Sequence, residues 1–416
     1  MSRAVPAVLL ILALSACTDP WPNVYSLKGL RVMAVRAEPP DLAPGQSTSL
    51  EALVVDPTAP ARLNTLLWLA CNPDPTQLDQ PECAKYETLE SFQNGGGDAG
   101  LASLPKGLVP LGMTAPAGAP AFPIIYKAPA DTFANVPADD KRRIKGVIAV
   151  VLMLAIAEEP PARWPPTEQD LADLLGRASR KEVPSVLTIK RLRVSETPTP
   201  NHNPTLDHLR IEEENWAPGP RPVKIVPGVW THFLSFAGDG AKEAFQDLDV
   251  DGNVVTKTES LSTSWFTTFG EFDKDRTVEG EIDRPEHLYL PYVLADVPDD
   301  RQGQVYAVLR DSRGGVDWNV RNFFICDPAL PAPVVSSVEP TSGPPGSFVK
   351  LKGEHLDDLI DVRAGIDWLS DAAWDDAEKA YVGAIPVDAP VGELSLVLRG
   401  KGCTADPSAK FTVTAP

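Results

Sequence analysis

The chain has 416 residues, 43 of them proline, and a formal net charge of −19. Its hydrophobic content of 43% and charged content of 23% are typical of a folded globular protein and argue against a disordered one. The acidic balance also argues against a nucleic-acid partner, because neutralising phosphates takes clustered Lys and Arg. A chain of this length is expected to form two or three domains, and its many prolines favour short strands joined by turns.

The N-terminal residues have the composition of an export signal. Arg3 precedes the apolar run Ala4–Ala13, and small residues follow it. This run is shorter than the roughly 20 apolar residues that cross a bilayer. Leu14–Cys17 reads Leu-Ser-Ala-Cys and resembles the lipobox of bacterial lipoproteins, in which the cysteine becomes the lipidated first residue. The resemblance implies a signal peptide over 1–16, a lipidated Cys17 and a membrane partner through this anchor; ordinary secretion with a free Cys17 is the alternative.

The residue after the cysteine bears on location. Thr18 stands where enteric lipoproteins retained in the inner membrane carry Asp. The resemblance therefore implies a cell-envelope protein, with the Gram-negative outer membrane favoured and the periplasmic or surface face left open. Residues 17–26 are expected to form the lipidated tether.

Four further cysteines predict disulfides, because the cysteines of exported proteins meet an oxidising environment. Cys71 and Cys83 bracket turn-forming proline segments and are expected to pair with each other, which is worth about 3 kcal/mol in the chain-entropy account. Cys326 and Cys403 then pair by elimination. Zinc binding is the alternative, and the spacing argues against it because the chain has no C-x-x-C and its five histidines are scattered.

Short strand-like runs separated by turns begin the body of the chain. They are Leu27–Ala37, Ser47–Val55 and Leu66–Cys71. Their spacing favours a β-sandwich over βαβ units. Val147–Ile156 is almost continuously apolar, which suits a central strand buried on both faces, although a buried helix has the same pattern.

One segment has a helical pattern. Thr167 and Asp170 form a capping-box signature, and three leucines on one helical face follow it, namely Leu171, Leu174 and Leu175. We expect a helix of about twelve residues on the flank of the first sandwich. The proline-rich segment 197–204 is predicted to be a stiff linker.

A second series of strand-like runs follows the linker. They are Val223–Val226, Thr231–Ala237, Thr263–Thr268, Val305–Leu309 and Asn322–Cys326. Val305–Gly315 resembles the late strand and turn of bacterial Ig-like or PKD-like modules. Trp265 echoes Trp68 of the first series, and both are expected in cores, with a ligand-stacking platform as the alternative.

The last segment carries the strongest family resemblance in the body. Pro333–Gly353 resembles the opening of an IPT/TIG domain, in which a first strand ends in a Pro-x-Ser-Gly turn and a second strand ends in Gly. Val387–Leu398 and Phe411–Thr414 resemble the closing strands of that family. The resemblance implies an Ig-like sandwich.

We therefore predict an all-β fold of tandem Ig-like β-sandwiches, with one helical insertion in the first. The expected divisions are an Ig-like domain over 27–196, the linker 197–204, a second Ig-like domain over 205–328 and an IPT/TIG-like domain over 329–416.

One acidic segment has the pattern of a cation site. Its candidate calcium ligands are Asp247, Asp249, Asp251 and the carbonyl of Asn253. The EF-hand pattern further requires a Glu at its twelfth position, where Thr258 stands. The alternative, which we favour, is an acidic hairpin turn set by Asp-Gly.

No catalytic residue is predicted. Adjacent carboxylates such as Glu212–Glu214 and Asp299–Asp300 usually decorate a solvated face, whereas glycoside hydrolases need two facing across a cleft. The sequence has no nucleophile elbow and no phosphate-binding loop. Trp368 and Trp374 are candidates for a carbohydrate or protein contact, with ordinary packing as the favoured alternative.

These features predict a lipid-anchored, non-enzymatic envelope protein serving interaction, adhesion or structure. IPT/TIG-like units occur beside glycan-active domains, so the resemblance also implies a carbohydrate-binding accessory lipoprotein. A hydrolase with its site between modules is the third alternative. The expected partners are the membrane and an unidentified protein or glycan, and no cofactor is expected apart from the calcium option.

Overall fold

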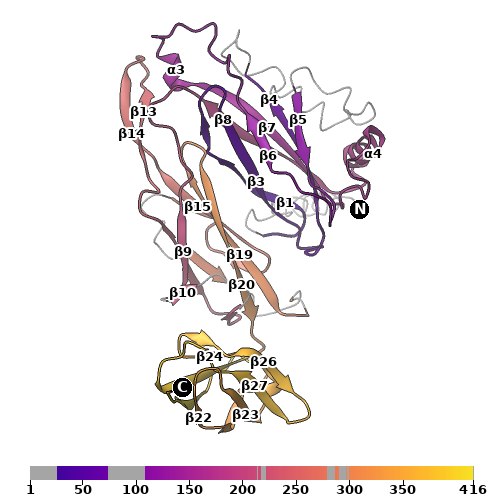
Figure 1. Ribbon diagram of the computed structural model, residues 1–416, viewed down its shortest axis with the longest axis vertical. Helices are drawn as coiled ribbons and strands as arrows, with labels where there is room; N and C mark the ends of the chain where they lie inside the picture. Colours follow the sequence, from indigo (N-terminus) through magenta and orange to yellow (C-terminus); the bar gives the residue numbers. More distant parts are fainter. Residues whose placement is uncertain are drawn as a thin grey trace, which may run out of the picture. The chain divides into compact units, whose positions relative to one another are not determined.

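A computed structural model describes residues 26–73, 108–212, 214–216, 222–278, 286–289, 297 and 299–415. The predicted all-β class of tandem β-sandwiches is confirmed, since the strands form mostly antiparallel sheets that pair face to face (Figure 1). The chain divides into two compact units. Unit 1 comprises Met1–Pro218, Thr231–Leu288 and Gln304–Arg321, and unit 2 comprises Gly219–Trp230, Tyr289–Gly303 and Asn322–Pro416.

The first sandwich of unit 1 is built from two sheets. One has the order β1 (Arg31–Glu38), β3 (Ser47–Val55) and β6 (Ile124–Lys127). The other has the order β2 (Asp41–Leu42), β8 (Ser185–Val194), β7 (Val147–Ile156), β4 (Thr65–Cys71) and β5 (Leu108–Met113). Trp68, Tyr126 and Met153 belong to one buried cluster between the sheets, so the expected core position of Trp68 is confirmed.

Strand β7 explains its own apolar sequence. Its odd-numbered residues, such as Ala149 and Val151, face the core between the sheets. Its even-numbered residues Val150 and Leu152 pack in a second cluster, and Ile156 packs against helix α4 (Glu168–Ser179). The predicted central strand buried on both faces is confirmed.

Helix α4 matches its sequence signature. The Thr167 side chain accepts a hydrogen bond from the backbone N–H of Asp170, and the Asp170 carboxylate accepts one from the N–H of Thr167. Its buried residues include Leu171, Leu174 and Leu175. A further four-residue helix, α3 (Arg142–Lys145), has no counterpart among the predicted elements.

The second sandwich of unit 1 has an aromatic core. One sheet has the order β10 (Glu214–Trp216), β9 (Leu206–Ile211), β12 (Thr231–Ala237), β18 (Glu286–Tyr289) and β16 (Glu271–Phe272). The facing sheet contains β20 (Val316–Ile325), β19 (Gln302–Asp311), β15 (Leu261–Thr267) and β17 (Arg276–Val278). The Phe233 ring lies 5.3 Å from Trp216, 6.5 Å from Trp265 and 5.9 Å from Phe272 between ring centroids, which confirms a core position for Trp265.

Buried charges join the two sandwiches within unit 1. Arg313 Nη2 lies 3.0 Å from Asp41 Oδ2, and Arg313 Nη1 lies 3.2 Å from Glu259 Oε1. Asn201, inside the segment predicted as a linker, is fully buried, and its backbone N–H donates to Asp41. A buried apolar cluster also joins the two sandwiches. It contains Met33 of β1 together with apolar residues of β19 and β20. Segment 197–204 therefore packs into unit 1.

Unit 2 contains the third sandwich and a short strand that precedes it in sequence. One sheet has the order β21 (Val334–Glu339), β23 (Phe348–Glu354), β27 (Ala380–Ala384) and β26 (Ser370–Asp375). The other has the order β22 (Ser342–Gly343), β29 (Ser408–Val413), β28 (Gly392–Gly400), β24 (Leu359–Ala364) and β25 (Asp367–Trp368). Leu351, Leu396 and Phe411 pack between the sheets. Strand β11 (Val223–Ile225) pairs in parallel with Phe323–Ile325.

Candidate functional site

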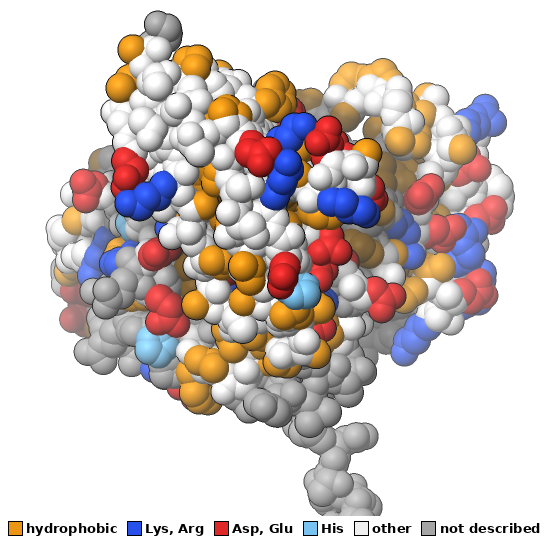
Figure 2. All heavy atoms as spheres, turned by 90° about the horizontal axis from the view of Figure 1, so that it is seen from below, with side chains coloured by type: hydrophobic (Ala, Val, Ile, Leu, Met, Phe, Trp, Pro, Cys, Tyr) orange, Lys and Arg blue, Asp and Glu red, His pale blue; other side chains and the backbone are white. Residues whose placement is uncertain are grey.

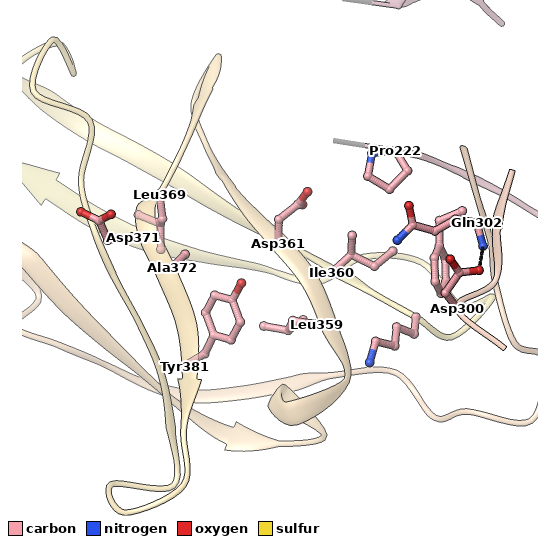
Figure 3. A pocket seen from close by; sticks show the side chains of 12 residues that line it. Pro222, Asp300, Gln302, Leu359, Ile360, Asp361, Leu369, Asp371, Ala372 and Tyr381 are labelled. Atoms are coloured by element: carbon pink, nitrogen blue, oxygen red, sulfur yellow. Dashed lines mark hydrogen bonds between the residues drawn. The ribbon is translucent and has the colours of Figure 1, made fainter. Parts of the chain in front are cut away.

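A cavity of about 530 Å³ lies in unit 2 (Figure 3). We call one side of it the strand-end wall, which consists of Pro222, Asp300, Gln302 and Phe324. The other side, the sandwich wall, consists of Leu359, Ile360, Asp361, Leu369, Asp371, Ala372, Tyr381 and Lys401. In Figure 3, Pro222, Gln302 and Asp300 lie at one end and Asp371, Leu369 and Ala372 at the other. The cavity thus has polar side chains at both ends.

Burial separates the lining into a floor and a rim. The floor is apolar, because Phe324, Leu359, Leu369 and Tyr381 are buried. The rim residues Asp300, Gln302 and Asp371 are exposed. The surface that the cavity exposes is therefore mostly polar, above a buried apolar floor.

Two strand irregularities shape the sandwich wall. Leu359 pairs with Gly400 and Asp361 pairs with Arg399, so Ile360 is an extra residue in β24. Such a bulge bends its strand and redirects side chains, and bulges concentrate near binding sites.

The second irregularity lies in β26, an edge strand. Ser370 pairs with Ala384 and Ala373 pairs with Val382, so this strand also carries an extra residue, between Ser370 and Ala373. Asp371 lies in that interval with a φ of 50°, in the left-handed region that Asp tolerates better than most side chains. Both bulges therefore fall on the cavity.

Gly383 of β27 allows the second bulge to pack closely. A Cβ added at this position would lie 3.1 Å from the Cβ atoms of Ala372 and Leu369. A side chain there would push against two residues that line the cavity. The glycine is therefore part of the cavity's construction.

Arg399 connects the two walls from outside the lining. Its Nε donates to Asp361 Oδ1 at 2.6 Å, its Nη2 also contacts the Asp361 carboxylate, and its Nη1 donates to the carbonyl of Pro222 at 2.7 Å. The guanidinium lies 4.5 Å from the centroid of the Trp368 ring. Both partners of the Asp361–Arg399 ion pair are largely buried, with side chains 11% and 14% exposed. Asp361 is therefore neutralised by its own neighbour.

A disulfide joins the chain segments at the Lys401 end of the cavity. Cys326 and Cys403, the pair expected from the sequence, are bonded to each other. Beside them Asp327 donates its N–H to the carbonyl of Lys401 at 2.8 Å and accepts from the N–H of Cys403 at 3.2 Å. Lys401 Nζ itself lies 3.8 Å from Asp358 Oδ1. Position 401 is thus fixed from both sides.

The remaining cysteine predictions depend on segments that the structure does not describe. Cys71 is disulfide-bonded, but Cys83, its expected partner, lies outside the described residues. Cys17 and the rest of the signal and tether before Ser26 also lie outside them. Lipidation at Cys17 remains a prediction.

The predicted calcium ligands do not come together. Asp249 lies in the loop of the hairpin β13 (Ala244–Leu248) and β14 (Val254–Thr258), and its Oδ1 accepts from the N–H groups of Asp251 and Asn253. Asp247 Oδ2 lies 2.6 Å from Lys257 Nζ. The Asn253 carbonyl accepts from the N–H of Asp249. Across the described ranges no group of three His, Cys, Asp or Glu side chains is placed to hold a metal, and the acidic segment forms the turn of a hairpin.

The other candidates have structural partners. Glu212 accepts from the backbone N–H of His232 at 3.0 Å, while Glu213 is not described. Trp374 donates to Asp376 and packs against the third core, and Trp368 stacks on Arg399. Packing thus accounts for Trp374, while Trp368 supports the cavity without lining it.

The sequence missed most of the cavity. It singled out Asp300 only within an acidic pair, and it passed over Gln302, Asp371 and Lys401. No motif marks these residues, because they come from separate segments of the chain. Asp371 begins the acidic segment Asp371–Glu378, to which the sequence assigns no site.

Comparisons with known proteins give no family. No family model matches the chain, and no curated protein sequence matches it. The resemblance of Pro333–Gly353 to IPT/TIG domains therefore stays a prediction. Among the described residues, no helix is both long and apolar enough to span a bilayer.

The chain has weak similarity to several solved structures. The chain is similar to the SGBP-B protein of a Bacteroides ovatus mixed-linkage glucan utilization locus, with 18% identity, a TM-score of 0.18 and coverage of 36% of this chain and 37% of that one. It is similar to SGBP-B from a Bacteroides uniformis xyloglucan utilization locus at 15% identity and a TM-score of 0.17, covering 51% and 49%. It is also similar to the three N-terminal domains of the bacteriophage RB49 outer capsid protein Hoc. The identity is 9% and the TM-score 0.19, and the match covers 93% of this chain and 100% of that one. Similarity at this level assigns no ligand to the chain.

Proposed function

We propose that this chain is a lipid-anchored, non-enzymatic binding protein of the cell envelope, and that the unit 2 cavity takes a saccharide. The observation that carries this proposal is the pairing of an apolar floor with an exposed rim of two carboxylates and an amide. The anchor part rests on the lipobox-like Leu14–Cys17.

The chemistry of the rim suits hydroxyl groups. Asp300 and Asp371 offer carboxylate oxygens that accept from hydroxyls, and Gln302 offers both a donor and an acceptor. Lys401 adds a cationic donor at one end. Hydrogen bonds in which one partner is charged are about twice as strong as neutral ones, so a few such groups can orient a polyhydroxyl ligand.

The floor suits the apolar face of a sugar ring. Leu359, Leu369 and Tyr381 are buried beneath the cavity. A pyranose presents C–H groups on one face and hydroxyls at its edge, so it can contact this floor while its hydroxyls reach the rim. The floor therefore favours a ring over an extended polar chain.

The charge of the lining disfavours anionic ligands. Three aspartates and one lysine line the cavity, and the Asp361 carboxylate is paired with Arg399. The net charge of the remaining charged residues in the lining, Asp300, Asp371 and Lys401, is negative. A phosphate or carboxylate ligand would meet like charge, whereas a neutral saccharide would not.

Exposed hydrophobic side chains also occur on the molecular surface, interspersed with acidic and basic ones on the face that Figure 2 shows. In the third sandwich Phe348 is 65% exposed and Val387 is 84% exposed. Scattered exposed apolar residues are normal on folded proteins. They do not displace the cavity as the main candidate site.

A glycan array tests the saccharide. Detergent-solubilised full-length protein is expected to bind a subset of neutral oligosaccharides, and D371A and Q302A are expected to weaken that binding at least about tenfold, because each loses a hydrogen bond to the ligand. The control is D388A, which removes an exposed carboxylate outside the lining. Equal binding by D371A, Q302A and D388A would contradict the site. New reducing ends in the bound oligosaccharide would instead indicate a hydrolase.

Mass spectrometry of protein from membranes tests the anchor. The mature chain is expected to begin at a diacylated Cys17, and C17S is expected to leave the signal segment uncleaved and the protein unlipidated. Detection of an unmodified N-terminus elsewhere would contradict the anchor and leave the cavity proposal untouched.

A further inference from the structure

The cavity lies between chain segments that are distant in sequence. Its strand-end wall comes from residues before β11 and from the ends of β19 and β20, and its sandwich wall comes from the third sandwich. The width of the cavity changes when one wall moves relative to the other. The affinity of the cavity for a ligand then depends on the contacts that hold the two walls together.

We infer that Arg399 and the Cys326–Cys403 disulfide act together as a clamp that fixes the gap between the two walls and so sets the affinity of the cavity. This inference rests on the proposed function. Neither the arginine nor the disulfide lines the cavity. Their role is therefore positioning.

Arg399 holds one side of the clamp through directed contacts. Its guanidinium bonds Asp361 on the sandwich wall and the Pro222 carbonyl on the strand-end wall. The face of the guanidinium is covered by Trp368. The planar guanidinium group has several N–H donors in fixed directions and makes these contacts at the same time. The single ammonium group of a lysine cannot reproduce them.

The disulfide holds the other side covalently. It links Cys326, directly after β20, to Cys403, two residues after Lys401. Backbone hydrogen bonds of Asp327 to residues 401 and 403 run beside it. Next to them, Arg301 Nη2 lies 2.7 Å from Asp327 Oδ2. The positions of Gln302 and Lys401 are thus tied to the same few residues.

A clamp of this kind acts through preorganisation. A ligand that enters a fixed gap does not have to restrict the motion of the walls, and that saved entropy appears as affinity. Removing either part of the clamp widens the range of gaps. The polar side chains of the rim are then less often placed to contact the ligand at the same time, and the affinity falls.

The width of the gap can be measured without knowing the ligand. Spin labels at D299C and A373C, which are exposed and lie next to Asp300 of the strand-end wall and Ala372 of the sandwich wall, report the gap in detergent-solubilised full-length protein. The variants are R399K, which keeps the charge, and C326S/C403S. The control is K410A, which removes the exposed Lys410–Glu393 ion pair of the same sandwich. Circular dichroism confirms that each variant is folded at the measuring temperature.

We expect a narrow distance distribution in the wild type and in K410A, and a broader one in R399K and C326S/C403S. The affinity of these two variants for the best-bound oligosaccharide of the array is expected to fall about tenfold. An unchanged distribution in both variants would overturn the inference, as would a broader distribution with unchanged affinity. If the wild type binds no oligosaccharide, the proposed function fails, and the distance distributions still decide whether the clamp exists.

Discussion

Arg313 is the residue on which the joint of unit 1 depends. Its side chain is 5% exposed, and it faces the carboxylates of Asp41 and Glu259, which are 2% and 0% exposed. The guanidinium also lies 4.5 Å from the centroid of the Phe245 ring and donates to the carbonyl of Thr199 at 2.7 Å. Arg313 is the cation that pairs with the buried Glu259, whereas Asp41 also pairs with Arg193.

We expect R313A to lower the free energy of unfolding by about 3–5 kcal/mol, because it leaves the buried Glu259 carboxylate without its cation and leaves Asp41 with Arg193 alone. Urea unfolding followed by fluorescence measures the change. K379A, which removes the exposed Lys379–Asp376 pair, is expected to change stability by less than about 0.5 kcal/mol. Similar small effects of both variants would show that the joint does not depend on this charge.

Glu259 gives the joint a pH dependence. Burial raises the pKa of Glu259 above its ordinary value, and the nearby Asp311 carboxylate raises it further. A carboxyl whose pKa is higher in the folded state contributes most to stability below its unfolded pKa and loses that contribution as pH rises through the folded pKa. We expect the stability advantage of the wild type over E259Q to decline as pH rises from about 4.5. If the difference in urea midpoint between the wild type and E259Q stayed constant as pH rises, the raised pKa of Glu259 would be disproved.

At the scale of single residues, the sequence allowed prediction only where the interaction is local. The acidic motif at Asp247–Asn253 left a cation site open beside the favoured hairpin turn, and in the structure Asp249 Oδ1 accepts hydrogen bonds from the backbone N–H groups of Asp251 and Asn253 in that turn. Arg313 and its partners could not be foreseen, because they lie up to 272 residues apart. Burial of a charge is decided by the fold, and a local pattern does not encode it.

Helix α4 is the element that the sequence specified best. Its cap, its apolar face and its length all follow from neighbouring residues. Strand β7 was predictable for a similar reason, since burial on both faces requires an unbroken apolar run.

We expect T167A to lower the stability of unit 1 by about 1 kcal/mol, because the capping hydrogen bond to Asp170 is lost. Q169A in the same turn removes only a side-chain pair with Asp173 and is expected to cost about 0.5 kcal/mol or less. Thermal melts of the two variants give the comparison. A larger loss for Q169A would contradict the capping account.

The bulges in β24 and β26 show why the cavity escaped sequence analysis. An extra residue in a strand changes the face on which a side chain lies, yet it leaves no fixed signature in the chain. Asp371 reads as one more acidic residue in an acidic stretch. Only the pairing register shows that it falls in a bulge beside the cavity.

For the whole molecule, the buried joint predicts how the chain unfolds. The two sandwiches of unit 1 share a buried charge cluster and an apolar cluster, so we expect them to unfold as one cooperative transition. Differential scanning calorimetry is expected to show R313A lowering that transition while a second one, from unit 2, keeps its midpoint. Equal shifts of both, or separate transitions for the first and second sandwiches, would contradict this organisation.

The interleaving of the two units has a practical consequence for dissecting the protein. The polypeptide passes from one unit to the other five times, so no single protease cut can release either as an intact fragment. An expression plasmid that starts at the apparent module boundary near position 329 would discard Cys326 and β11 and leave Cys403 with an orphan thiol. Such a fragment would be exposed to wrong intermolecular disulfides, and its behaviour would say little about the complete chain.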